Sequence, residues 1–145
     1  MRHRKNLLSQ GFTLIEILVV VVIIGILAGV VLPKIMGAPD QARVTRAKQD
    51  ISAIQTALDL YKLDNGVYPT TEQSLMSLVE KPTAPPLPQS WHQYLPQMPT
   101  DPWGRAYQYL NPGTQGEIDI FTYGPTGQPG GTGDKAEIGN WVAHA

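Results

Sequence analysis

The chain has 145 residues, no cysteine, and 11 Lys and Arg against 12 Asp and Glu, which gives a formal net charge of −1. This length leaves room for one small domain, and the near-neutral charge gives no indication of a nucleic-acid-binding surface. Without cysteine there are no disulfides and no thiol nucleophile, and only three histidines are present, so the composition argues against an enzyme.

The N-terminal segment joins a basic leader to a long apolar run. Three Lys or Arg residues occur within the first five positions, and the run over residues 12–32 contains only Thr13 and Glu16 as polar side chains. A helix over this run is about 31 Å long, which is enough to cross a bilayer core. The basic leader favours a cytoplasmic N-terminus. We therefore expect a single-pass membrane helix, with the rest of the chain on the outer side.

Glu16 lies one helical turn inside the apolar run, where a charged side chain is costly and needs a partner. Cleavage after Gly11 would place the new amine of Phe12 at nearly the same depth. In two staggered neighbouring chains, the amine of one could then pair with Glu16 of the other. The alternative is that Glu16 reaches the headgroup region by itself, because it is close to the start of the helix.

Pro33, Gly37 and Pro39 follow the apolar run, so the helix is expected to kink or partly open there. Beyond this point, apolar residues recur at steps of three and four, which predicts an amphipathic helix whose stripe faces the rest of the domain. The stripe consists of Val44, Ala47, Ile51, Ile54, Leu58 and Tyr61. Asp64-Asn65-Gly66 should end this helix with a left-handed turn.

The remaining chain has the pattern of a small mixed domain. Thr71 is a candidate N-cap for a short helix over residues 72–80, and a proline-rich connection follows. A tight turn is expected at residues 101–104, and residues 106–110 and 117–123 read as two antiparallel strands. The segment after the second strand is glycine-rich and should be irregular. The fold class is therefore α+β, with a long N-terminal helix packed on a short helix, a small antiparallel sheet and a C-terminal loop.

The string at residues 10–17, Gln-Gly-Phe-Thr-Leu-Ile-Glu-Ile, resembles the type III signal of type IV pilins and type II secretion pseudopilins. The resemblance implies that a prepilin peptidase cuts after Gly11 and methylates the amine of Phe12. It also implies that Glu16 supports subunit assembly, that the apolar helix is both membrane anchor and filament core, and that the helix melts around Pro33 in filaments.

Further motifs are similar to those of the major pseudopilins of type II secretion systems. They are Tyr61-Lys62-Leu63-Asp64-Asn65, Tyr68-Pro69-Thr70-Thr71, Asp101-Pro102-Trp103-Gly104 and Gly139-Asn140-Trp141. The resemblance implies a type IV pilin-like fold with a leader over residues 1–11, a transmembrane and filament-core helix over residues 12–33, and a periplasmic head over residues 34–145.

The same resemblance implies a homopolymeric periplasmic filament, the pseudopilus, that drives folded exoproteins through an outer-membrane secretin. Its further partners would be minor pseudopilins, the prepilin peptidase, an inner-membrane assembly platform and a secretion ATPase. One alternative is a type IV pilin of a surface pilus, although many such pilins have a disulfide that this chain cannot form. Another is a membrane protein or enzyme that keeps its leader, which the peptidase-like junction disfavours.

The resemblance also implies a calcium ion in the C-terminal loop. The candidate ligands here are Tyr123, Thr126, Gln128, Asp134 and Glu137. Thr126 and Lys135, however, stand where aspartates are expected, and losing carboxylates while gaining a cation weakens calcium binding. A metal-free loop closed by hydrogen bonds and by packing of Trp141 is therefore favoured over a weak or remodelled calcium site. Lys135 would pair with Asp134 or Glu137.

Overall fold

The computed structural model describes residues 11–141, apart from the side chains of residues 30–38 and of Asp134. Residues 1–10 of the expected leader therefore lie outside the described residues. The chain divides into two compact units, residues 1–40 and residues 41–145.

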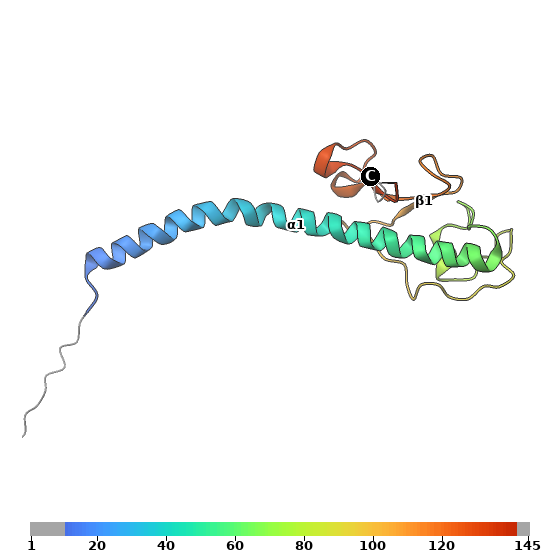
Figure 1. Cartoon of the computed structure of the whole chain (residues 1–145), viewed down its shortest axis with the longest axis horizontal. Coiled ribbons are helices and arrows are strands. Elements are labelled where there is room, and N and C mark those ends of the chain that lie inside the picture. Colours follow the sequence, from blue (N-terminus) through green and yellow to red (C-terminus); the bar gives the residue numbers. More distant parts are fainter. Residues whose placement is uncertain (1–10, 142–145) are drawn as a thin grey trace, which may run out of the picture. The chain divides into compact units, whose positions relative to one another are not determined.

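One helix, α1, runs from Leu14 to Asn65 and contributes to both units (Figure 1). Its N-terminus is capped by Thr13, whose hydroxyl accepts a hydrogen bond from the Glu16 N–H at 3.3 Å. The opening expected near Pro33 is not seen, because α1 is a single unbroken helix. A proline removes only one helical N–H, and the bonds on either side of it remain possible.

The end of α1 follows the expected turn chemistry. The N–H of Gly66 donates to the carbonyl of Lys62 at 2.7 Å, and Gly66 has a φ of 80°, in the left-handed region that glycine tolerates. The expected apolar stripe is also confirmed. Five of its six members are at most 4% exposed, and Val44 packs against them at the margin. The stripe forms one core with residues of the sheet and of the first 3₁₀ helix.

The sheet contains three antiparallel strands in the order β1-β2-β3: Gln108–Leu110, Asp119–Thr122 and Ile138–Gly139. β1 and β2 lie within the two expected strands and are shorter. β3 was not expected, since two residues in a glycine-rich segment give no strand signal before Ile138 pairs with Thr122. Figure 1 shows β1 beside the later part of α1, and all four residues of β2 are buried.

The expected helix over residues 72–80 is reduced to a 3₁₀ helix, η1, from Leu75 to Leu78. Thr71 is not its N-cap, because the Thr71 hydroxyl bonds the backbone of Asn111, at 3.0 Å to the carbonyl and 2.8 Å from the N–H. Ser74 caps η1 instead, through the N–H of Met76. A tertiary contact has thus replaced the local cap that the sequence favoured.

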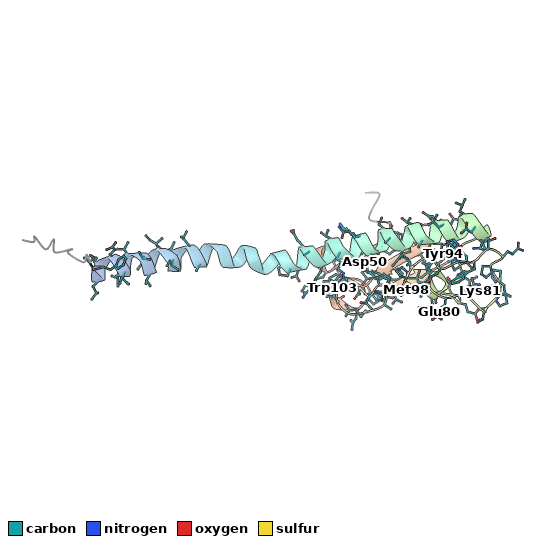
Figure 2. All side chains as sticks on the ribbon, turned by 90° about the horizontal axis from the view of Figure 1, so that it is seen from below. Asp50, Glu80, Lys81, Tyr94, Met98 and Trp103 are labelled. Atoms are coloured by element: carbon teal, nitrogen blue, oxygen red, sulfur yellow. The ribbon has the colours of Figure 1, made fainter. Side chains whose placement is uncertain are left out.

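The long connection after η1 covers one side of the core. The indole N–H of Trp91 donates to the Ser77 carbonyl at 2.7 Å, and Tyr94, Met98 and Trp103 are partly buried against the core (Figure 2). On the helix, the labelled Asp50 accepts a hydrogen bond from the Tyr107 hydroxyl at 2.7 Å. Burial and this bond raise the pKa of Tyr107, which keeps the phenol neutral as a donor.

Candidate functional site

The expected cleavage junction lies just before α1. Gly11 and Phe12 are exposed and outside any helix, and Phe12 has 80% of its surface free. No atom lies within 4 Å of the position that a Cβ on Gly11 would take. Among the described residues, therefore, none beyond the immediate chain neighbours crowds Gly11 at the Gly11–Phe12 bond.

Glu16 occupies the first turn of α1, in the pattern Thr13-x-x-Glu16. The Thr13 hydroxyl accepts from the Glu16 N–H, and an acidic side chain in the first turn is favoured by the helix dipole. The sequence contains this signal, a Thr and a Glu three residues apart at the start of an apolar run. The helix start therefore stabilises the Glu16 carboxylate within its own chain, independently of any contact that this carboxylate makes with a second chain. The side chain of Pro33 lies outside the described residues.

Large apolar side chains dominate the first part of α1. From Phe12 to Leu27, every such side chain is at least 49% exposed. Among the helices of the described part of the chain, none is long and apolar enough to cross a membrane. The exposure nevertheless identifies an interaction surface, because a contiguous exposed apolar area of this extent marks a site that contacts lipid or another protein.

The C-terminal loop, residues 123–137, begins with the 3₁₀ helix η2, Gly124–Thr126. The Thr126 hydroxyl lies 3.3 Å from the carbonyl of Tyr123 and 3.1 Å from the carbonyl of Gln128. It also accepts from the Gln128 N–H at 3.3 Å. The structure thus brings together three of the expected ligand positions, but around a hydroxyl group of the chain itself.

The second part of the loop contains the 3₁₀ helix η3, Gly133–Lys135. Glu137 accepts a hydrogen bond from the Gly130 N–H at 3.3 Å. The described residues include no ion pair between Glu137 and Lys135, and the Asp134 side chain, the other expected partner, is outside them. No three His, Cys, Asp or Glu side chains converge as a possible metal site in the part of the chain that the structure describes.

Arg105 lies outside the C-terminal loop but contacts it, and the sequence analysis did not predict this contact. Its Nη2 donates to the carbonyl of Gly124, and a Cβ placed on Gly127 would lie 2.7 Å from its Cζ, so the guanidinium rests against that glycine. Its buried Nε has no hydrogen-bond partner among the described residues and lies 4.0 Å from Oδ2 of Asp101. The only nearby sequence signal is the tight turn at residues 101–104, which does not predict the contact of Arg105 with the loop.

Asp101 positions Arg105 from that turn. Its Oδ1 accepts from the backbone N–H groups of Trp103, at 3.0 Å, and Arg105, at 2.7 Å. Its Oδ2 accepts from the Thr122 hydroxyl at 2.5 Å, and the Asp101 side chain is fully buried. The expected tight turn is confirmed, with Gly104 at a φ of 83°. It also ties β2 to the base of the C-terminal loop.

A second carboxylate organises the hairpin loop, residues 111–118, between β1 and β2. Asp119 is 1% exposed and accepts from the N–H groups of Thr114, Gln115 and Gly116, at 2.6 to 3.2 Å, and from the Thr114 hydroxyl at 2.8 Å. Burial alone would raise the pKa of Asp119, but these hydrogen bonds outweigh it, and the pKa is lowered. Asp119 is therefore a structural anion.

Nothing in the described residues has the arrangement of a catalytic centre. A shallow groove of about 630 Å³ lies between α1 and the hairpin loop, with Lys48, Asp59 and Glu117 among its lining residues. Within residues 11–141 the one histidine, His92, is exposed, lies 3.4 Å from Asp64 and stacks on Tyr94. His92 is not among the residues that line the groove, so the groove and the histidine are separate features.

Two family models match the chain in succession. The one described as prokaryotic N-terminal methylation motif covers residues 7–32. The one described as type II secretion system (T2SS), protein G covers residues 34–141. The second match spans well over half of the chain and includes the whole C-terminal loop up to Trp141.

Similar proteins carry the same description. The type II secretion system core protein G of Pseudomonas aeruginosa is 58% identical over 135 residues, which cover 92% of this chain and 95% of that protein. The protein of the same name from Vibrio cholerae is 54% identical over 140 residues, which cover 95% of each. The crystal structure of the major pseudopilin from the type 2 secretion system of enterohaemorrhagic Escherichia coli matches with a TM-score of 0.67 and 48% identity, over 74% of this chain and 90% of that one. The chain belongs to the type II secretion system protein G family and has its pilin-like fold.

Proposed function

We propose that this chain is the major structural subunit of a type II secretion pseudopilus, a periplasmic filament that drives folded exoproteins through the outer-membrane secretin. The observation that carries the proposal is the match to core protein G relatives through both the N-terminal motif and the head. The proposed role is structural, as it is for the major pseudopilin that the chain resembles.

The N-terminal segment supports anchoring and polymerisation. Its apolar side chains between Phe12 and Leu27 are exposed in the single chain, so lipid or neighbouring subunits must cover them. Before assembly the segment that includes residues 12–33 anchors the chain in the inner membrane, with a cytoplasmic leader and a periplasmic head of residues 34–145. In the filament the same surface forms the core between subunits.

Processing prepares the N-terminus for this role. Prepilin peptidase removes residues 1–11 and methylates the amine of Phe12, and the open geometry around Gly11 suits such access. The new amine pairs with Glu16 of a neighbouring subunit, since a charge in an apolar surrounding needs an opposite one. Pro33 marks the point where the helix can loosen during assembly.

The further partners follow from this role. They are minor pseudopilins, the inner-membrane assembly platform with its secretion ATPase, and the secretin. The alternative of a surface type IV pilin is not favoured, because the relatives named above are each named as core protein G of a type II secretion system.

The test is secretion by a strain that lacks this gene and is complemented with the wild-type chain, Glu16→Ala or Glu72→Ala. We expect wild type and Glu72→Ala to restore exoenzymes to the culture supernatant, whereas Glu16→Ala, which removes the carboxylate from the helix start, does not. Glu72 is the matched control, because it is an exposed acid of the head. Surface pili are scored in the same cultures.

Two results would contradict the proposal. Normal exoenzyme levels with lost surface pili would move the chain to the pilin class. A purified chain whose mass still includes residues 1–11 would refute processing, and Gly11→Glu, which should keep the leader, provides the reference mass.

A further inference from the structure

We propose that the C-terminal loop of this chain closes without a metal ion, and that the Arg105 guanidinium and the Thr126 hydroxyl fasten it where relatives would be expected to use a divalent cation. This inference goes beyond the pseudopilus role and concerns how the head keeps its shape. It rests on which groups satisfy the inward-facing carbonyls of the loop, on the charges around them, and on the close approach of Arg105 to glycine.

The carbonyl oxygens offer the first argument. A calcium ion needs six to eight oxygen ligands at about 2.4 Å. The carbonyls of Tyr123 and Gln128, two of the expected ligands, instead lie within hydrogen-bond distance of the Thr126 hydroxyl. A hydroxyl has one hydrogen to donate, so it serves these two carbonyls in turn while accepting from the Gln128 N–H.

Arg105 supplies the second argument. Its guanidinium donates to the carbonyl of Gly124 at the base of η2. Asp101 holds Arg105 there, because Oδ1 of Asp101 accepts from the backbone N–H of Arg105 and Oδ2 of Asp101 lies 4.0 Å from Nε of Arg105. The guanidinium of arginine is planar and presents its N–H donors in a fixed fork, so it can donate to one carbonyl while its flat face rests against a glycine.

Three glycines of the loop show that its two arms and Arg105 are tightly packed. A Cβ on Gly127 would meet the guanidinium at 2.7 Å, and one on Gly131 would overlap the carbonyl of Lys135. One on Gly124 would meet the carbonyl of Ala136 at 2.8 Å. The two arms of the loop therefore lie against each other, and Arg105 lies against the first arm.

The charges around the loop oppose a divalent cation. Residues 123–137 contain two acids, Asp134 and Glu137, and one base, Lys135. Glu137 already accepts from the Gly130 N–H, and Arg105 adds a second positive charge from outside the loop. With Asp101, which lies 4.0 Å from that guanidinium, the count is three acids against two bases, and one of the three already faces Arg105. This is a small excess of carboxylates, and calcium affinity depends on a large one.

The experiment uses the full-length chain in detergent micelles, with thermal unfolding of the head followed by near-ultraviolet circular dichroism. Midpoints are compared in about 1 mM calcium and about 1 mM EGTA, and calcium binding is measured directly by calorimetry. We expect no binding heat and equal midpoints. A site with calcium at a hundredfold excess over its Kd would raise the midpoint by about 10 °C or more, and that result would overturn the proposal.

Variants test the fastening itself. Arg105→Met and Thr126→Val should lower the midpoint by several degrees in both buffers and speed amide hydrogen exchange within residues 123–137. Thr126→Ser keeps the hydroxyl and should retain wild-type exchange in the loop. Lys81→Met removes an exposed cation of the head and is the matched control for Arg105.

Exchange rates in the loop that stay at the wild-type value in both Arg105→Met and Thr126→Val would contradict the fastening role. Restoration of either variant by calcium would do so as well, because it would show that the carbonyls remain available to a metal. If Arg105→Met fails to fold, the wild-type comparison of calcium and EGTA still decides the metal question, and Arg105→Lys replaces it in the exchange measurement.

Discussion

In the hairpin loop, residues 111–118, backbone N–H groups donate to one carboxylate, whereas in the C-terminal loop, residues 123–137, backbone carbonyls accept from a hydroxyl and a guanidinium. In the first loop three consecutive amides surround the carboxylate of Asp119. In the second, carbonyls meet the Thr126 hydroxyl and the Arg105 guanidinium. Each loop is closed by a side chain whose hydrogen-bonding character is the opposite of the backbone it faces.

The difference teaches how a domain without disulfides can hold irregular segments. Buried backbone groups need partners, and a turn that points several groups of one kind inward needs a single strong donor or acceptor. A charged side chain meets that need, because charge-assisted hydrogen bonds are the stronger ones. The side chain comes from the adjoining strand in the hairpin loop and from a distant turn in the C-terminal loop.

The largest effect is expected from Asp119→Ala. It removes the acceptor of three buried N–H groups, and we expect it to lower the free energy of unfolding by about 3 kcal/mol or more. Urea unfolding of the full chain in detergent, followed by tryptophan fluorescence, measures this. Glu72→Ala is the control and should stay close to wild type. A loss below about 1 kcal/mol would mean that water replaces the carboxylate and that the two loops are not held in comparable ways.

A smaller effect is expected from Gly127→Ala, compared with Gly130→Ala. Both glycines have positive φ, 67° and 86°, so both alanines carry the strain of the left-handed region, about 1 kcal/mol. Only at Gly127 would the new Cβ meet Arg105, while the space at Gly130 is open. We therefore expect Gly127→Ala to cost about 1 kcal/mol more than Gly130→Ala. Equal losses of unfolding free energy in Gly127→Ala and Gly130→Ala would show that Arg105 does not contribute to closing the loop.

Acid should weaken the hairpin loop through Asp119. The pKa of Asp119 is lowered in the folded chain, so its contribution to stability is complete above the unfolded value of 3.8 and is lost as the pH falls through the folded value. Amide hydrogen exchange in residues 113–118, followed at decreasing pH, measures this loss. The C-terminal loop has carboxylate contacts of its own, from Asp101 to Arg105 and from Glu137 to Gly130, so the test rests on residues 113–118. Unchanged protection of residues 113–118 throughout the acid range would contradict the role of Asp119.

The sequence by itself determined the features that depend on neighbouring residues. The step of three and four residues from Ala47 to Tyr61 places one face of α1 in the core, as expected. Gly66 and Gly104 end a helix and a turn at positive φ, because those positions need a residue without a Cβ. The motif around Gly11 and the motifs of the head led to the family that the comparisons identify.

Tertiary structure decided what depends on residues far apart in the chain. Thr71 contacts Asn111, 40 positions away, and so the expected helix after it shortened to η1. β3 exists because Ile138 reaches Thr122, and Arg105 reaches Gly124 only through the fold of the turn before it. Periodicity and turn chemistry act over a few residues, where local sterics dominate. The partner of a hydrogen-bonding side chain is chosen by which backbone groups the packed core leaves unsatisfied, and no short stretch of sequence contains that information.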